Sequence, residues 1–435
     1  MAITSVSRSG VTAAVPGQAG NNTAAMAVVT TLFFMWGFIT CLNDILIPHL
    51  ANIFDLNYAQ SMLVQLFFFF GYFVFALPSG RIVEWFGYKR TMVVGLITMA
   101  FGAAAFIPAA VALSYPLFLA ALTIIAAGMT ALQVSANAYV AVLGKPETAS
   151  SRLNLAQAFN SLGTTIAPWF GSMLILSGTI IAVDELRRMA PAARHAYEIQ
   201  QAATVKMPYL GLAIVLVGLA VVIGLFKLPL ISTHAGPGHE TAASTGKTSI
   251  WKHRHLLLGV IAIFVYVGAE VAIGSFLVKY LSRPEIGNFS EQTAAAYVSV
   301  YWGCAMAGRF VGSAILQRLK PGGVLGCAAL IAFLLVAATM LTSGSIAMWS
   351  VLIIGLFNSI MFPTIFTLGI AELGPLTGEG SGLLVMAIVG GAVIPFVQGL
   401  IADRIGIHHA FILPLLCYLY IAFYGFRGSK VTVAA

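Results

Sequence analysis

The sequence predicts an all-α polytopic membrane protein, and three observations support this fold class. Of the 435 residues, 60% are hydrophobic and only 8% are charged, which leaves too little polar surface to cover a soluble protein. Apolar runs of about 20 residues recur along the whole chain, and each is long enough to cross ~30 Å of hydrocarbon as a helix. These runs are continuous, whereas the strands of a membrane barrel are short segments of alternating polarity. We therefore expect helices that cross a bilayer.

Twelve spans are expected, each an apolar run bounded by polar or charged links. In chain order they cover residues 25–50, 59–83, 91–112, 117–143, 152–178, 207–229, 255–281, 292–316, 323–343, 346–371, 380–402 and 409–427.

Two polar interruptions divide the spans. The first, from Gly178 to Lys206, contains DELRRMAPAARHAYEIQQ and predicts a surface loop with a short amphipathic helix. The second, near the middle of the chain, is rich in Gly, Ser, Thr and His and predicts a linker. The expected divisions are a disordered cytoplasmic tail (1–24), a six-helix bundle (25–229), a cytoplasmic linker (230–254), a second six-helix bundle (255–427) and a cytoplasmic tail (428–435).

The net charge of +8 predicts membrane topology and not nucleic-acid binding, because the Lys and Arg residues sit mostly in the links between spans. With the N-terminus inside, the inner links and tails carry about twice as many basic residues as the outer ones. Positive residues mark the cytoplasmic side, so both termini are expected there. The four cysteines have no metal-like spacing, so neither a metal site nor a disulfide framework is expected.

The two halves repeat at a nearly constant offset of 227 to 232 residues. The matched pairs include Gly37 with Gly268, Gly71 with Gly303, Gly128 with Gly355, and Gly163 with Gly390. A steady offset in helix order predicts two pseudo-symmetric six-helix bundles. Membrane transporters built from such parallel repeats place their site between the repeats, near the middle of the bilayer.

Of the fourteen acidic residues, only Asp44 and Glu270 lie well inside predicted spans. An acid in hydrocarbon costs ~3 kcal/mol or more, so it marks a functional site by default. Under the repeat, the two acids lie on equivalent helices. Each can exchange a proton, bind a cation, or accept hydrogen bonds from hydroxyl groups. The structural alternative is a buried acid paired with a neighbouring group, for example Glu270 with Lys279.

Amide side chains recur at helical spacing and predict a polar cavity, mostly in the first half. Amide side chains spaced three or four residues apart lie on one face of a helix. An aromatic ring beside them can stack on the C–H face of a sugar. Amides donate and accept, which suits a ligand covered with hydroxyl groups; the alternative is hydrogen bonding between helices. The expected substrate contacts are Trp36, Asn43, Asp44, Gln133, Asn137, Gln157, Asn160 and Asn358, and the expected ion-coupling residues are Asp44 and Glu270.

The link after the second span predicts a gating latch. A tight glycine turn with an acid and basic neighbours can hold adjacent helices through charge pairs and a helix end. Its members are Gly80, Glu84, Gly87, Lys89 and Arg90. The segment resembles the loop motif of the major facilitator superfamily, with Glu84 in place of the usual aspartate.

Four further segments carry a more specific resemblance: LNDILIPHL, LQVSANAYVAVLG, RLNLAQAFNSLG and NSIMFPTIFTLGIAELG. With these segments the chain, over residues 25–427, resembles the fucose:H⁺ symporter family of the major facilitator superfamily, nearer to its glucose/galactose and N-acetylglucosamine transporters than to fucose permease. The resemblance implies twelve helices, alternating access and cation-coupled hexose uptake. It implies a role for Asp44 in substrate binding and proton coupling. It also implies that Trp36, Asn43, Gln157 and Asn160 lie around the sugar pocket.

One residue departs from fucose permease. Where that protein has a glutamate thought to carry the proton, this chain has Gln133, which cannot titrate. Coupling then falls on Asp44 or Glu270, or the driving ion is Na⁺. The same substitution is typical of the glucose/galactose-like branch, which moves the expected substrate away from 6-deoxy sugars.

The expected function is therefore import of a glucose/galactose-like hexose by H⁺ or Na⁺ symport, with no bound cofactor. N-acetylglucosamine or L-fucose symport is the alternative within the family, and a multidrug or metabolite exporter of the same fold is the alternative of another class. The sequence shows neither a nucleophile–base pair nor a metal-binding cluster of the kind that would indicate an enzyme. A monomer in the bacterial cytoplasmic (inner) membrane is expected, with the sugar and the bilayer as its partners.

Overall fold

The computed structural model describes residues 19–54, 56, 58–174, 189–229 and 249–431, and within these ranges every regular element is a helix. The first half of the chain comprises α1 (Ala19–Phe54), α2 (Tyr58–Val111), α3 (Tyr115–Val142), α4 (Ala149–Leu174), α6 (Pro191–Thr204) and α7 (Lys206–Leu225). The second half comprises α8 (Arg254–Leu281), α9 (Glu291–Ile315), α10 (Pro321–Leu341), α11 (Gly344–Asn358), α12 (Met361–Gly369), α13 (Thr377–Met386), α14 (Gly390–Ile405), α15 (Ile407–Ala410) and α16 (Ile412–Phe423).

These helices are consistent with the twelve predicted spans. Two spans are joined in α2, which departs from helical geometry at Gly87 (φ 77°). The chain reverses there, because Gly71 contacts Ala126 while Gly95, 24 residues later, contacts Gly128, only two residues further along α3. A straight helix would separate these two glycines by ~36 Å. Only glycine adopts this positive φ without strain.

Some boundaries differ from the expected ones. The first helix begins at Ala19 and not at residue 25, because a helix can extend beyond the apolar run that crosses the membrane. The tenth span is split into α11 and α12, and the eleventh into α13 and α14 with a 3-10 turn between them, Ala387–Val389. The amphipathic helix expected in the outer loop is present as α6. The predicted linker lies mostly outside the described residues.

The surface of the bundle is apolar, as a lipid-facing surface must be. Large side chains such as Phe101, Ile214 and Leu341 are exposed, whereas the amides of Gln133, Asn137 and Asn358 are buried. Among the described residues, nine helical stretches are long and apolar enough to cross a membrane. Polar groups inside and apolar groups outside are the inverse of a soluble protein.

The predicted repeat is visible in two matched helix crossings. In the first half, α1 and α4 approach so closely that a Cβ on Gly163 would overlap the carbonyl oxygen of Phe34. In the second half, Gly390 stands in the same relation to Phe264 of α8. Small residues allow this approach of two backbones in membrane proteins.

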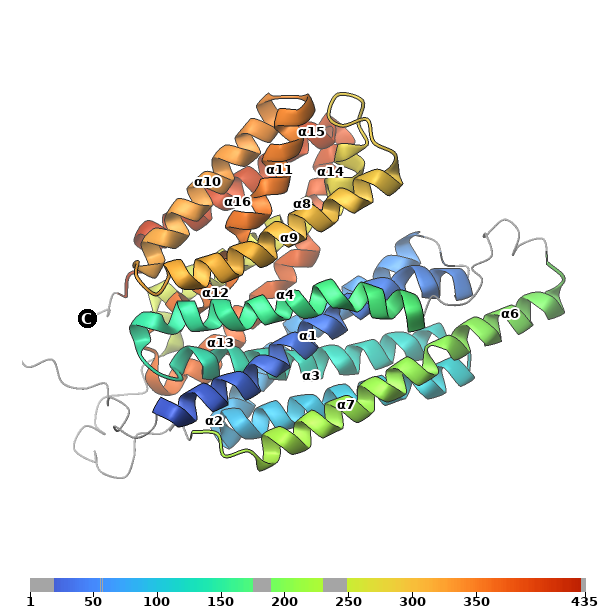
Figure 1. Cartoon of the computed structure of the whole chain (residues 1–435), viewed down its shortest axis with the longest axis horizontal. Helices are drawn as coiled ribbons and strands as arrows, with labels where there is room; N and C mark the ends of the chain where they lie inside the picture. Colours follow the sequence, from blue (N-terminus) through green and yellow to red (C-terminus); the bar gives the residue numbers. More distant parts are fainter. Residues whose placement is uncertain (1–18, 55, 57, 175–188, 230–248, 432–435) are drawn as a thin grey trace, which may run out of the picture.

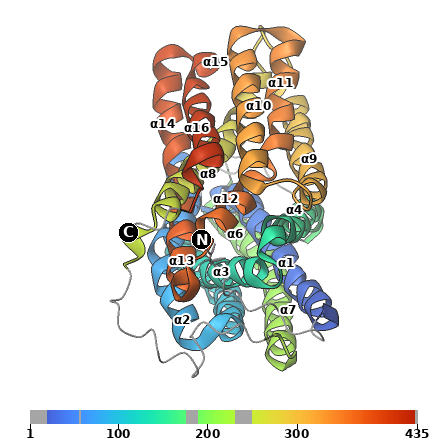
Figure 2. The same cartoon turned by 90° about the vertical axis from the view of Figure 1, so that its left-hand side faces the viewer.

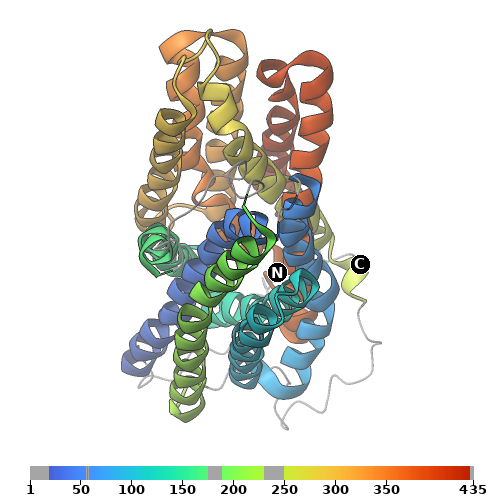
Figure 3. The same cartoon turned by 90° about the vertical axis from the view of Figure 1, so that its right-hand side faces the viewer.

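The two halves meet at one end of the molecule and diverge toward the other. Figure 1 shows α10, α11 and α16 rising away from α1 and α4, while α4 and α9 lie together at the left, where α1 begins. Figures 2 and 3 show the same arrangement from the two ends. We call the end where the halves meet the closed end.

Two sets of contacts join the halves at the closed end. The first set lies along α4, and we call these hydrogen bonds between the halves the seam. They link Ser150 to Thr367 (2.6 Å), Ser151 to Ser313 (2.7 Å) and Asn154 to Thr364 (3.4 Å). Beside it, α2 packs on α13 through glycines. A Cβ on Gly80 would lie 2.7 Å from the Gly378 carbonyl oxygen, and one on Gly382 would lie 2.8 Å from that of Ala76.

Candidate substrate site between the two halves

The first predicted site element is the middle of α1. Its backbone is helical throughout Ala19–Phe54, so Trp36, Thr40, Asn43 and Asp44 share one face, as expected from their spacing. Trp36 is buried. The side chains of Asn43 and Asp44 lie outside the described part of the structure, so their contacts stay predictions.

Gln133 on α3 forms the centre of the first-half site. Its side chain is buried, and its Nε2 donates to the hydroxyl of Tyr72 on α2 at 2.5 Å. The Gln133 Oε1 atom is buried without a hydrogen-bond partner. A buried polar atom without a partner costs about 1–3 kcal/mol, which a ligand hydroxyl group would offset by donating to it.

One turn further along α3, Asn137 offers the complementary group. Its Oδ1 accepts from Gln157 Nε2 of α4 at 3.5 Å, while its Nδ2 is buried without a partner. Gln133 and Asn137 thus leave one acceptor and one donor unused on the same face of α3. A hydroxyl group donates and accepts, so neighbouring hydroxyl groups of one ligand match this pair.

Asn160 is used differently from the expectation of a free amide. Its Nδ2 donates to the carbonyl oxygen of Phe33 at 3.0 Å and so joins α4 to α1 next to the glycine crossing. The alternative of hydrogen bonding between helices is therefore observed at this position.

The second half contains a network of tyrosines around Asn358. Both ends of the Asn358 amide are hydrogen-bonded, since Nδ2 donates to Tyr301 (2.9 Å) and Oδ1 accepts from Tyr418 (2.7 Å). The Tyr266 hydroxyl lies 3.0 Å from the Asn358 carbonyl oxygen and 2.8 Å from Glu270 Oε1, and these two acceptors share its single proton. Asn358 thus organises three tyrosines from three helices, and its predicted contact with a substrate stays a prediction.

The structural alternative of Glu270 paired with Lys279 is wrong. Nine residues along an α-helix turn through about 900°, which places the two side chains on opposite faces. Glu270 instead accepts from Tyr266 and interacts electrostatically with Arg309 of α9.

Arg309 is a site residue that the sequence reasoning missed. It lies in the second half of α9, where its Nη1 donates to Ser161 Oγ and to the Gln157 carbonyl oxygen (3.3 Å), both on α4. Its Nε donates to the Ser359 carbonyl oxygen (3.4 Å) of its own half. A signal was present, because a basic residue well inside a predicted span is as costly as an acid.

Tyr72, Tyr301 and Tyr418 were also missed. Each is buried and holds a predicted amide, Gln133 or Asn358. No sequence signal identified them, because which helix faces meet is decided by the packing of the bundle.

Part of the predicted latch lies at the contact between the two halves, and its gating role stays a prediction. Gly80 and Glu84 lie against α13 of the other half, since a Cβ on Gly378 would be 3.0 Å from the Gly80 carbonyl oxygen and 3.2 Å from Glu84 Cγ. Gly87 makes the chain reversal. Arg90 is exposed, and within the described ranges neither it nor Lys89 forms an ion pair.

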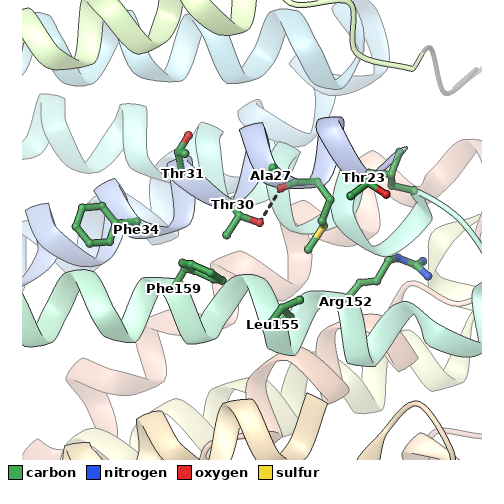
Figure 4. A pocket seen from close by; sticks show the side chains of 10 residues that line it. Thr23, Ala27, Thr30, Thr31, Phe34, Arg152, Leu155 and Phe159 are labelled. Carbon is green, nitrogen blue, oxygen red and sulfur yellow. Dashed lines mark hydrogen bonds between the residues drawn. The ribbon is translucent and has the colours of Figure 1, made fainter. Parts of the chain in front are cut away.

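A cavity of about 580 Å³ between α1 and α4 is separate from these polar groups. Figure 4 shows its lining, which is mostly apolar and includes Phe34, Leu155 and Phe159. Its charged residue, Arg152, already donates to the carbonyl oxygens of Ala141 and Lys145 at 2.8 Å. None of the predicted site residues lines this cavity, so it is not the candidate substrate site.

Comparison with known proteins decides the family. The model of the family described as Major Facilitator Superfamily matches residues 27–388. This chain belongs to the major facilitator superfamily. The membership expected from its sequence motifs is thereby confirmed.

Curated relatives of this superfamily member are named as transporters. It is 54% identical over 407 residues to a glucose/galactose transporter of Brucella abortus, an alignment that covers 93% of this chain and 94% of the relative. It is 44% identical over 418 residues to a putative glucose/galactose transporter of Helicobacter pylori (95% and 98% covered). It is 37% identical over 420 residues to the L-fucose-proton symporter of Escherichia coli (96% of each chain).

Among solved structures, this superfamily member is similar to the Escherichia coli fucose:proton symporter in the outward conformation. The TM-score is 0.86 at 36% identity, with 94% of this chain and all of the other covered. The predicted all-α fold of two pseudo-symmetric bundles is confirmed, and the count of twelve spans is consistent with it.

Proposed function

We propose that this protein is a secondary active transporter that imports a glucose- or galactose-like monosaccharide by H⁺ or Na⁺ symport through alternating access. The observation that carries this proposal is its 54% identity, over nearly the whole chain, to a protein named as a glucose/galactose transporter. The unused acceptor on Gln133 and donor on Asn137 support it, because they suit a ligand with adjacent hydroxyl groups.

Each half has a distinct role in this proposal. In the first half, Gln133 and Asn137 contact sugar hydroxyl groups, Trp36 packs on the sugar ring, and Asn43, Asp44, Gln157 and Asn160 complete the pocket. In the second half, the Asn358 network fixes the position of Glu270. Asp44 and Glu270 carry the coupling cation.

The proposed setting is the bacterial cytoplasmic membrane, with the protein as a monomer and both termini inside. The closed end then faces the cytoplasm, because α1 and α4 begin there. In this proposal the described state opens toward the outside, and its similarity to a relative in the outward conformation supports this.

The test is counterflow in proteoliposomes. Purified protein is reconstituted with unlabelled galactose inside, and uptake of labelled galactose is followed with and without Na⁺ at two pH values. We expect counterflow that excess unlabelled glucose suppresses more strongly than L-fucose or N-acetylglucosamine. Absence of counterflow with all four sugars would contradict the proposed function, and suppression chiefly by L-fucose or N-acetylglucosamine would reassign the substrate.

Replacing Gln133 with alanine is expected to weaken galactose binding about 3- to 10-fold, because one hydrogen bond is worth about 0.5–1.5 kcal/mol. The measurement is the galactose concentration that half-saturates counterflow. The matched control is Gln317→Ala, since Gln317 is exposed just after α9. Equal affinities in the two variants would place the pocket elsewhere.

A further inference from the structure

Arg309 joins the two halves of the bundle at a point that matters for transport. It belongs to α9 of the second half, yet two of its hydrogen bonds reach α4 of the first, at Ser161 Oγ and the Gln157 carbonyl oxygen. The seam must open when the protein turns to its other access state. Arg309 therefore makes contacts that exist in one access state and are lost in the other.

The Arg309 side chain also interacts with Glu270, the buried acid of its own half. Arg309 interacts electrostatically with Glu270, and its Nε donates to Ser359, the neighbour of Asn358 in the tyrosine network. Among described residues, the charged or titratable side chains that interact electrostatically with Glu270 are Tyr266 of α8, Tyr301 and Arg309 of α9, and Tyr418 of α16. Arg309 is the cation of this group.

Contacts continue from Arg309 to the predicted sugar contacts. Gln157, whose carbonyl oxygen accepts from Arg309, also donates through its side chain to Asn137. The Arg309 guanidinium group thus lies between Glu270 of the second half and the Gln157–Asn137 pair of the first half. Such proximity alone does not prove coupling, which requires an element with two arrangements that both sites bias; the seam is that element.

We propose that Arg309 is a positioning residue through which the charge on Glu270 controls how firmly the seam is held. This inference rests on the proposed function. While Glu270 is negative, it attracts the guanidinium toward α8 and competes with α4. When a cation neutralises Glu270, this attraction is lost, and the remaining acceptors of Arg309 lie on α4 and at Ser359.

The consequence is an order of events. Cation loading tightens the seam and favours the state whose opposite end is open, so the cation prepares the site that then receives the sugar. A ligand shifts an equilibrium between two states only by the difference in its affinity for them. Here the ligand is the cation, the two states are the closed and the open seam, and Arg309 makes the cation affinity of Glu270 differ between them.

The experiment is a double-mutant cycle in which the measured quantity is the distance between two labels, one on each half, and not the transport rate. Nitroxide labels are placed at Lys145 and Lys320, exposed residues at the closed end of the two halves. The background has Cys41, Cys304, Cys327 and Cys417 replaced by serine or alanine, and the label distance distribution gives the ratio of closed to open seam. Glu270→Gln stands in for the cation-loaded acid.

We expect Glu270→Gln to raise the closed-to-open ratio about fivefold or more, and Arg309→Gln to lower it by a similar factor. In the Arg309→Gln background, Glu270→Gln should have no further effect. Arg309→Lys, which keeps the charge but loses the planar fork, should lie between wild type and Arg309→Gln, and it provides the cycle if Arg309→Gln does not fold. The control Arg254→Gln, an exposed arginine at the start of α8, should leave the ratio unchanged.

An equal effect of Glu270→Gln in both backgrounds would overturn the proposal, as would a wild-type ratio in Arg309→Gln. The two levels of inference can fail separately. If wild-type protein shows no sugar counterflow while the label distances follow the expected cycle, the proposed function fails and the role of Arg309 stands.

Discussion

Replacing Asp44 with asparagine is expected to abolish accumulation of sugar against its gradient while counterflow continues. Asparagine retains hydrogen bonding but carries no charge and exchanges no proton. Gln133 cannot titrate in its place, so the first half would have no acid well inside its spans. The measurement compares accumulation under an imposed cation gradient with counterflow at equilibrium in the same vesicles.

The matched control is Asp403→Asn, because Asp403 is an exposed acid near the end of α14. It should accumulate sugar as the wild type does. Normal accumulation by Asp44→Asn would assign coupling to Glu270 alone, whereas loss of counterflow as well would mean that Asp44 is needed for sugar binding itself.

Replacing Gly382 with valine is expected to open the closed end. A Cβ there would lie 2.8 Å from the Ala76 carbonyl oxygen, so α13 and α2 can no longer pack backbone to backbone. Overpacking of this kind costs about 1–3 kcal/mol, a shift of roughly 5- to 150-fold between two states. The Lys145–Lys320 label pair measures this shift directly.

The control for this variant is Gly303→Val, also inside a helix of the second half, where a Cβ would meet nothing within 4 Å. It should keep the wild-type distribution of label distances. If Gly382→Val also keeps it, the glycine contact is not what holds the halves together, and the seam at α4 carries the closure alone.

The sequence predicted the helices well because the length of an apolar run is set by the thickness of the bilayer. It also located the repeat, since residues such as Gly163 and Gly390 must be small wherever two backbones touch. Helix ends were less well placed, and the breaks inside the tenth and eleventh spans were not foreseen, because apolar composition continues through them.

For the site, the sequence indicated which residues take part but not which hydrogen bonds they form. Gln133 and Asn137 were identified because amides are costly inside a membrane, but the bond from Gln133 to Tyr72 depends on how α2 is rotated against α3. Asn358 was predicted as a substrate contact, and the sequence did not foresee that two tyrosine hydroxyl groups also bond to its amide. The proposed pairing of Glu270 with Lys279 failed for a reason already visible in the sequence, the helical period.

The hydroxyl groups of the seam bear on how fast the protein can turn over. Thr367 also bonds to the Pro363 carbonyl oxygen, and Asn154 to that of Ser150, each four residues back in its own helix. When the halves part, Thr367 and Asn154 keep a hydrogen-bond partner in their own helix, and the serine hydroxyl groups exchange their partner for water at the opened end. The barrier to each transport cycle is then concentrated at Arg309 and the glycine contact, and substitutions there should change the turnover rate more than substitutions of the seam hydroxyl groups.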